Sequence, residues 1–155
     1  MRKNNLIKKN IVRKIGEGYC FLCGKKIKES EKSGEHVFPK WLQKKFDLYN
    51  KEISFIRGKK YNYRNFKVDC CYKCNHDKLN PIETKIRRAL NKGYEEFLKV
   101  DERDLFLWLN KIFYGIIYKE ILVSRHKDKG VKFPFYIKSV KERFHNFLFF
   151  ARVFR

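Results

Sequence analysis

Acidic residues are scarce in this chain of 155 residues. The sequence has 17 Asp and Glu against 38 Lys and Arg, which gives a formal net charge of +21. Self-repulsion of this size destabilises a compact protein unless a polyanion relieves it. Nucleic acid is therefore the first candidate partner, and an anionic membrane surface is the second. A genome biased toward Lys, Ile, Asn and Phe would also raise the number of lysines. It should raise the number of Glu residues as well, but the number of Glu residues remains low.

Long apolar runs are also missing. A membrane-spanning helix needs about 18–20 apolar residues in succession. The nearest run, Leu105–Val123, is interrupted by Asn110, Lys111, Lys119 and Glu120. The basic N-terminus lacks the apolar segment and the cleavage site of a secretory signal. We therefore expect a cytoplasmic protein without a membrane partner.

No internal repeat or low-complexity linker divides the chain, and its length suits one domain, or one small domain with an extension. Apolar residues make up 43% and charged residues 35% of the sequence, which argues against wholesale disorder. The expected organisation is a basic N-terminal arm over 1–18, a metal-stapled core over 19–92 and a helical extension over 93–155.

The five cysteines are expected to lie in a reducing compartment, where paired Cys-x-x-Cys spacing favours a metal over a disulfide. One pair is Cys20 and Cys23, and the other is Cys71 and Cys74. Four thiolates suit a tetrahedral zinc ion, so the sequence predicts a structural zinc site. Cys70 is the surplus thiol. It could replace Cys71 as a ligand, but Cys71 has the commoner spacing.

Periodicity and turn residues predict the secondary structure coarsely. Helices are expected over 39–46, from 80 to about 90, over 94–98, from 101 to about 124 and over 140–155, and strands over 53–56 and 61–68. In the helix over 39–46, Trp41, Leu42 and Phe46 should face inward. Asn80 is a plausible N-cap, and Asp101 can cap the long helix. The apolar stripe expected to form the core is Leu105, Trp108, Leu109, Ile112, Phe113, Ile116 and Ile117. The last helix is apolar around much of its surface, and it is a candidate homodimer contact.

Basic residues gather on the hairpin formed by the two predicted strands. They are Lys59, Lys60, Arg64 and Lys67. We expect this hairpin to contact nucleic-acid phosphates, and the alternative is an ordinary charged sheet face. Lys78, one helical turn after Asn75, could touch the same strand or be a plain surface lysine.

Between the two cysteine pairs lies the segment Gly34–Pro39, which reads Gly-Glu-His-Val-Phe-Pro. It places the carboxylate of Glu35 next to the imidazole of His36. Adjacent side chains on a strand point to opposite faces, so a bend or bulge would be needed to bring both to one metal centre. Gly34 makes such a distortion cheap.

These motifs resemble the zinc-stapled HNH endonucleases. That family has an acid-His pair, an apolar residue and Pro between two Cys-x-x-Cys knuckles, with Asn or His directly after the second knuckle. Here Glu35–Leu42 reads Glu-His-Val-Phe-Pro-Lys-Trp-Leu, and Cys71–Asn75 reads Cys-Tyr-Lys-Cys-Asn, followed by Glu83. The resemblance covers Cys20 to about Glu83. Beyond it, Trp108 with Lys111 resembles a Trp-x-x-Lys helix of the same subgroup.

The resemblance implies an α+β fold with a ββα-metal core stapled by the four-cysteine zinc site and a C-terminal helical extension. It implies that His36 is the general base, that Glu35 and Asn75 hold a catalytic Mg²⁺ or Mn²⁺, and that Asn65 orients the base. Glu stands where Asp is commoner. The family spacing points to Phe66 if counted from Cys71, and to Asn65 if counted from Cys70 or across a bulge.

The expected function is therefore a metal-dependent endonuclease acting on DNA, with RNA as the alternative substrate. A non-catalytic zinc module that binds nucleic acid, and a toxin or defence effector held inactive by a partner, are the competing hypotheses. His76 and Asp77 follow Asn75, and either could join a metal shell, although a solvent-facing first turn is the preferred interpretation.

Overall fold

The computed structural model describes residues 16–55 and 58–127, which form a mixed α+β structure. Residues 1–15 of the predicted arm over 1–18 lie outside the described residues, as does the predicted helix over 140–155 with its homodimer contact. In chain order the elements are η1 (Glu29–Glu31), β1 (Lys32–His36), α1 (Lys40–Lys45), β2 (Glu52–Ser54), β3 (Lys60–Asn62), η2 (Tyr63–Asn65), β4 (Lys67–Cys71), η3 (Cys74–Leu79), α2 (Asn80–Lys92), α3 (Tyr94–Leu98) and α4 (Glu102–Lys127).

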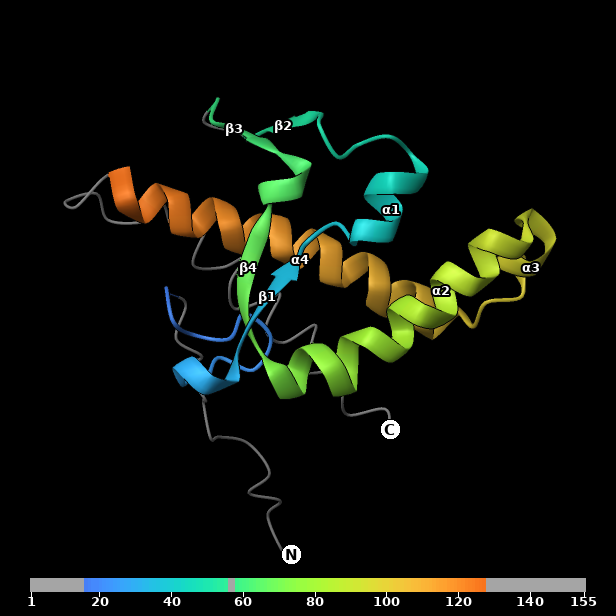
Figure 1. Ribbon diagram of the computed structural model, residues 1–155, viewed down its shortest axis with the longest axis horizontal. Helices are drawn as coiled ribbons and strands as arrows, with labels where there is room; N and C mark the ends of the chain where they lie inside the picture. Colours follow the sequence, from blue (N-terminus) through green and yellow to red (C-terminus); the bar gives the residue numbers. More distant parts are fainter. Residues whose placement is uncertain (1–15, 56–57, 128–155) are drawn as a thin grey trace, which may run out of the picture.

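The strands form two small antiparallel sheets, one of β1 and β4 and the other of β2 and β3 (Figure 1). β1 pairs with β4 in a register that places Lys32 opposite Cys71 and His36 opposite Lys67. β2 and β3 form the predicted hairpin beside Gly58, with Ile53 opposite Tyr61. Because β4 runs directly into η3 and α2, the pair β1–β4 is followed by a helix.

The predicted strand over 61–68 is wrong as a single element. It is two strands, β3 and β4, in different sheets, with the 3-10 turn η2 between them. Phe66 follows this turn and is fully buried, with its ring centroid 5.2 Å from that of Phe55 and 5.9 Å from that of Phe38. Burying Phe66 between these rings requires the chain to turn there, and an alternating pattern carries no signal for such a turn.

β1 lies outside the two strands predicted from the sequence, 53–56 and 61–68. Its pairing with β4 is regular, with Gly34 opposite Asp69 and Glu35 opposite Val68, so the expected bulge is absent from β1. Regular pairing places Glu35 and His36 on opposite faces of the strand. Glu35 is buried at 6% exposure, whereas His36 is half-buried at the end of the strand.

Helical structure after the second knuckle begins earlier than predicted. Asn80 is not an N-cap, because the π-helix η3 already starts at Cys74 and continues into α2. Pro81 has no backbone N–H to donate to the preceding turn, and its ring crowds the carbonyl four residues earlier. The π-helical turns of η3 end at Leu79, two residues before this proline. They lie where the proline disturbs the regular hydrogen-bond ladder.

The long helix α4 is capped as predicted. Asp101 Oδ1 accepts hydrogen bonds from the backbone N–H of Arg103 at 3.0 Å and of Asp104 at 3.3 Å. The face that α4 buries differs from the predicted stripe. Trp108 is buried, but Leu109 and Phe113 are about half exposed. The buried positions of this helix are Trp108, Lys111, Tyr114, Gly115, Tyr118 and Ile121.

Polar contacts and one glycine explain which residues of α4 are buried. The hydroxyl of Tyr118 donates to the carbonyls of Gly16 and Tyr19, each at 3.2 Å. Gly115 permits close approach of the backbone, since a Cβ there would lie 2.8 Å from both γ-carbons of Val37. A hydropathy pattern counts Lys and Tyr as poor core residues, so it misses Lys111, Tyr114 and Tyr118, although Ile112, Ile116 and Ile117 of the predicted stripe do pack against the core.

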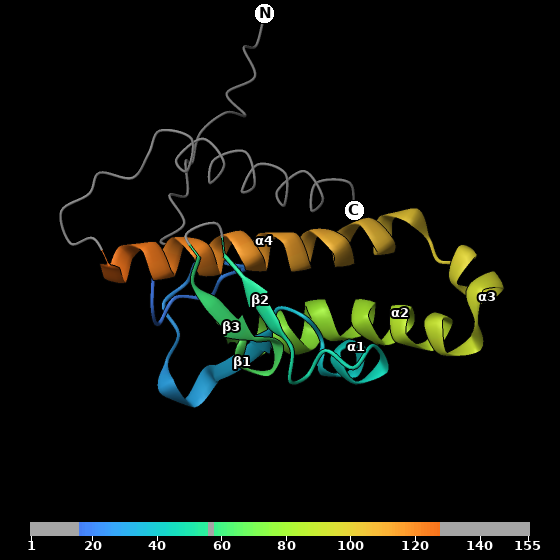
Figure 2. The same cartoon turned by 90° about the horizontal axis from the view of Figure 1, so that it is seen from above.

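The core lies between α4 and the strands (Figure 2). Phe21 of the first knuckle stacks on Tyr114 at 5.9 Å and meets Tyr118 edge-on at 6.1 Å. In α1 the expected inward position of Phe46 is wrong, because its side chain is 53% exposed. Gln43 is fully buried instead, where its Nε2 donates to Phe38 O at 2.6 Å.

Candidate metal centre and active site

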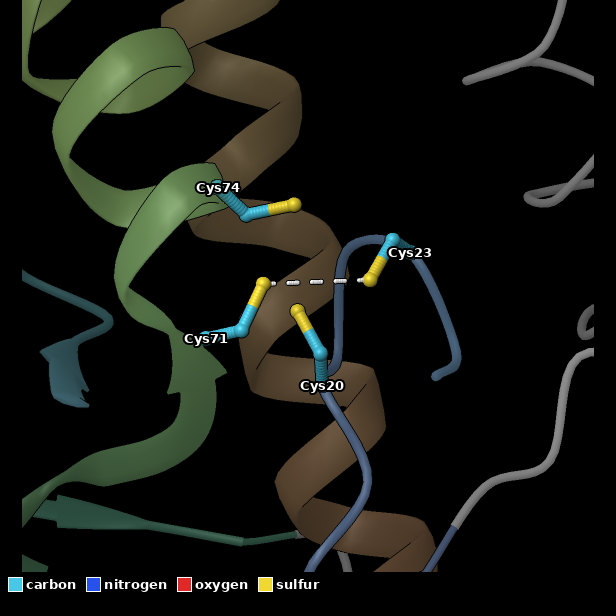
Figure 3. Close-up of side chains that lie close together, drawn as sticks. All are labelled: Cys20, Cys23, Cys71 and Cys74. Carbon is cyan, nitrogen blue, oxygen red and sulfur yellow. Dashed lines mark hydrogen bonds between the residues drawn. The ribbon is translucent and has the colours of Figure 1, made fainter. Parts of the chain in front are cut away.

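Four cysteines converge at one point from three elements. Cys20 and Cys23 come from the first knuckle, Cys71 ends β4 and Cys74 begins η3 (Figure 3). Their four Sγ atoms all lie within 4.8 Å of one another. These are the two predicted pairs, so the separation of 47 residues between Cys23 and Cys71 is closed by the fold.

The geometry fits a tetrahedral zinc ion. Zinc–sulfur bonds of about 2.3 Å in a tetrahedron separate the sulfur atoms by about 3.8 Å. The Sγ atoms of Cys23 and Cys71 are 3.9 Å apart. Four thiolates so close together repel one another strongly, and a dication between them removes that repulsion. The cluster can therefore hold a metal such as zinc.

The first knuckle is shaped by glycine and anchored to β4. Gly24 has a φ of +70°, a conformation that glycine adopts without strain, and its N–H donates to Cys20 O at 2.7 Å. Asp69 holds the knuckle from the sheet: its carbonyl accepts from Phe21 N at 2.9 Å, and its Oδ2 accepts from Gly18 N at 2.9 Å. The sheet and the metal ligands are thus one connected unit.

Cys70 lies beside the cluster but outside the group of four. It is fully buried, with its Sγ 3.9 Å from that of Cys20. The pKa of Cys70 is raised by its hydrogen bond with Cys20 and by burial, whereas the same contact lowers the pKa of Cys20. In this arrangement Cys70 keeps its proton and donates it in a hydrogen bond to the thiolate of Cys20. The fifth thiol then supports the cluster without binding the ion.

Asn75 lies against β1. Its side-chain Nδ2 donates to Ser33 Oγ at 2.8 Å, joining the start of η3 to the strand that carries Glu35 and His36. Ser33 and Glu35 share a face because they are two residues apart on a regular strand. With the amide nitrogen bound to Ser33, the Oδ1 atom of Asn75 is left as the acceptor. Asn75 therefore lies on the same side of β1 as Glu35.

His36 ends the strand in a half-buried position. Burial is the main cause that lowers its pKa to about 4, and the nearby charges of Lys67, Lys40 and Lys111 lower the pKa further. A hydrogen bond to the Arg64 backbone opposes this shift in the pKa. The imidazole is consequently neutral at pH 7, with one ring nitrogen free of a proton.

The backbone of η2 contacts the imidazole. The side chain of Asn65, expected to orient the base, is exposed on the same turn. The imidazole donates a hydrogen bond instead to the backbone of Arg64, one residue earlier, which is why this contact raises the pKa of His36. This contact could not be predicted from the sequence, because every residue has the same main-chain groups.

Glu35 belongs to a buried ion cluster that the sequence did not predict. The ammonium of Lys111, on α4, contacts Glu35 Oε1 and donates to Glu83 Oε1 at 2.7 Å. It also donates to His36 O at 2.8 Å and to Val37 O at 3.2 Å. Lys111 is only 3% exposed. Burial raises the pKa of Glu35, and the charge of Lys111 opposes that rise.

Replacing Lys111 with methionine is expected to destabilise the protein by about 3–5 kcal/mol, because removing one partner leaves a buried carboxylate unpaired. The urea midpoint measures this loss. Adding Glu35→Gln to the Lys111→Met variant removes the unpaired charge and should recover much of the lost stability. A single variant as stable as the wild type would contradict the paired role of Lys111.

The predicted phosphate-contacting residues lie on exposed positions of the described chain: Lys59, Lys60, Arg64, Lys67 and Lys78. Some have protein partners already. Lys60 Nζ lies 3.9 Å from Glu52 Oε2, and Arg64 donates to Asn50 Oδ1 at 2.8 Å. Lys67 lies opposite His36 in the register, and its charge is one of those that lower the pKa of the imidazole. Phosphate contact by these residues stays a prediction.

His76 and Asp77 pair with each other on the exposed side of η3. His76 Nδ1 lies 3.1 Å from Asp77 Oδ1, and the imidazole stacks on Tyr72 at 5.0 Å. Within residues 16–55 and 58–127, the group of three or more His, Cys, Asp or Glu side chains close enough to share an ion is the four-cysteine cluster. Neither residue joins that group.

Comparison with known proteins adds no relative. A scan against protein-family models and searches of curated proteins and of solved structures found no match to this chain. Within the part of the chain that the structure describes, no helix is both long and apolar enough to cross a bilayer.

Proposed function

We propose that the protein is a metal-dependent endonuclease with a ββα-metal core, that is, an HNH-type nuclease acting on DNA. The observation that carries the proposal is the hydrogen bond from Asn75 to Ser33. It joins the start of the helix after the second knuckle to the strand that carries the Glu35–His36 pair. The four-cysteine cluster lies at the ends of the same elements, since Cys71 ends β4 and Cys74 begins η3.

The oxygen atoms on this side of β1 suit a hard divalent ion. Glu35 offers a carboxylate and Asn75 offers an amide oxygen, the donor types that Mg²⁺ and Mn²⁺ prefer. Glu35 and Glu83 together carry two negative charges against the single ammonium of Lys111. Two carboxylates thus share a single ammonium, and when both are ionised a cation at Glu35 would balance the second charge. Such an ion, when bound, stabilises charge on the reacting phosphate and on its leaving oxygen.

His36 suits the role of general base. Its neutral imidazole can accept a proton from water at pH 7, and the hydrogen bond to the Arg64 backbone fixes the orientation of its ring. The attacking and leaving oxygens of a phosphoryl displacement lie in line on opposite sides of phosphorus. Because Glu35 and His36 leave β1 on opposite faces, a phosphate that both act on must lie beyond the end of the strand, where His36 is the last residue.

Cleavage of a labelled DNA duplex by the zinc-loaded protein tests this function. With Mg²⁺ or Mn²⁺ we expect products that carry 5′-phosphate and 3′-hydroxyl ends, because water attacks phosphorus and the 3′-oxygen leaves. Ligation with and without prior phosphatase treatment reads these ends. Products with 3′-phosphate or cyclic phosphate ends would contradict the proposed reaction.

A non-catalytic zinc module that binds nucleic acid is the second candidate. The high net charge and the four-cysteine cluster support it equally well. It leaves the neutral His36 and the Asn75–Ser33 contact without a role. Salt-sensitive binding without cleavage in any divalent ion would favour this candidate.

A further inference from the structure

A basic groove lies between α1 and α2. It has a volume of about 400 Å³, and its lining residues are Lys40, Trp41, Lys44, Arg87 and Asn91. The two helices are in contact near it, since Lys45 Nζ donates to Leu90 O at 3.4 Å. Figure 1 shows α1 above the second half of α2. We call this feature the α1–α2 groove.

The charge in the groove has one sign. Lys40, Lys44 and Arg87 are all exposed, and no carboxylate lines the groove. Among the described residues, no ion pair involves any of these three cations. Other basic residues of the same helices do have protein partners, as Lys85 does in Asp104. Three uncompensated cations facing one small groove repel one another, and a row of phosphates relieves that repulsion.

The floor of the groove is rigid. Trp41 stacks on Trp108 with ring centroids 6.0 Å apart and an interplanar angle of 19°. This contact ties α1 to α4, so Lys40 and Lys44 are carried on a helix with a fixed position. Lys40 and Lys44 are four residues apart and so lie on the same side of α1, one turn from each other. Arg87 faces them from α2.

One end of the groove is near the candidate base along the chain. Lys40 is the first residue of α1 and follows His36 by four positions. Its charge is one of those that lower the pKa of the imidazole. A chain of phosphates lying in the groove would therefore extend toward His36.

We propose that the α1–α2 groove binds the phosphodiester backbone of a nucleic-acid strand through Lys40, Lys44 and Arg87. The proposal deepens the proposed function, because this strand would be the one presented to His36. The groove extends the nucleic-acid surface to α1 and α2, away from the hairpin lysines predicted from the sequence. Its three cations come from two helices that the charge pattern of the sequence does not bring together.

Binding measured without hydrolysis tests the groove. The full-length, zinc-loaded protein is titrated into a fluorescent DNA duplex of about 20 base pairs without added divalent ion, over a range of salt concentrations, and anisotropy gives the affinity. A parallel titration uses an RNA duplex of the same sequence. The variant is Lys40→Gln/Lys44→Gln/Arg87→Gln. The matched control is Lys25→Gln/Lys26→Gln/Lys28→Gln, which removes three exposed charges beside the first knuckle.

The groove variant should weaken binding at least 10-fold at about 0.1 M salt. The slope of log affinity against log salt should become shallower by about 2–3, since each lost phosphate contact accounts for about 0.9. The control should change the affinity less than about 3-fold and the slope by less than about 1. Equal effects of the two variants would overturn the proposal, because then only net charge matters. Loss for DNA alone, or for RNA as well, identifies the nucleic acid that the groove accepts.

The outcome separates the groove from the nuclease. If wild-type protein binds but never cleaves, while the groove variant loses binding selectively, the groove stands and the nuclease fails. If the groove variant binds and cleaves like the wild type, the nuclease stands and the groove fails. Circular dichroism and zinc content, compared across the variants, verify that each one is folded.

Discussion

Single-turnover cleavage by the His36→Ala variant is expected to be about 100- to 10,000-fold slower than cleavage by the wild type. This is the usual contribution of a well-placed general base. The imidazole is neutral at pH 7 and is held by the backbone of Arg64, so alanine removes the proton acceptor without removing a charge. The measurement is the rate with a labelled DNA duplex in Mn²⁺, at enzyme concentrations well above that of the substrate.

His76→Ala is the matched control for this change. His76 is an exposed histidine on η3 that stacks on Tyr72 and pairs with Asp77. It should cleave at close to the wild-type rate. Zinc content and DNA affinity should be unchanged in both variants, since neither histidine belongs to the four-cysteine cluster. A His36→Ala variant that cleaves as fast as His76→Ala would remove His36 from the reaction.

The Cys71→Ser variant is expected to lose its zinc and its folded structure. Apparent binding free energies of structural zinc are about 10–16 kcal/mol, comparable to the whole stability of a domain. Cys71 is the last residue of β4, and its Sγ lies 3.9 Å from that of Cys23. Without the ion, the first knuckle keeps its hydrogen bonds to Asp69 and the packing of Phe21, but the four thiols that join it to β4 and η3 are left uncompensated. Zinc content by mass spectrometry and the thermal melt by circular dichroism give the result.

Cys70→Ala separates the two thiols that compete for the fourth ligand position. Cys70 is fully buried beside Cys20, so the change should cost about 1 kcal/mol from the small cavity it leaves. One zinc per chain should remain, because Cys70 lies outside the group of four. If Cys70→Ala loses the ion and Cys71→Ser keeps it, the ligand assignment is reversed.

Local patterns in the sequence predicted the parts of the fold that depend on neighbouring residues. Paired cysteine spacing predicted the cluster of Cys20, Cys23, Cys71 and Cys74, which the structure brings within 4.8 Å. Asp101 was correctly identified as a helix cap, because its side chain binds N–H groups two and three residues away. The hairpin of β2 and β3 was predicted from Gly58 and the flanking apolar residues.

Features that depend on distant parts of the chain were missed. β1 was not among the predicted strands, because its partner, β4, lies more than 30 residues away in the sequence. The buried face of α4 was predicted only in part, because Lys111 enters the core through its contacts with Glu35 and Glu83. A lysine is predicted to lie on the surface unless its carboxylate partners are known. The same contact shows that Glu35 has a protein partner, which the motif alone did not suggest.

The sequence predicted which residues belong to the candidate site, but it did not predict their contacts with the rest of the protein. The pairing of Glu35 with His36 and the Asn after the second knuckle were picked out from the motif. The hydrogen bond of Asn75 to Ser33 and the contact of His36 with the Arg64 backbone required the structure. Both contacts join segments separated by more than 25 residues, so no local pattern reports them.

The most direct test of the account is the conversion of supercoiled plasmid to nicked circles by zinc-loaded wild-type protein. The account predicts that nicked circles accumulate when Mg²⁺ or Mn²⁺ is added and that none form when the ion is omitted. Plasmid that stays supercoiled in both ions, although the protein binds it and carries its zinc, would contradict the proposal of a nuclease.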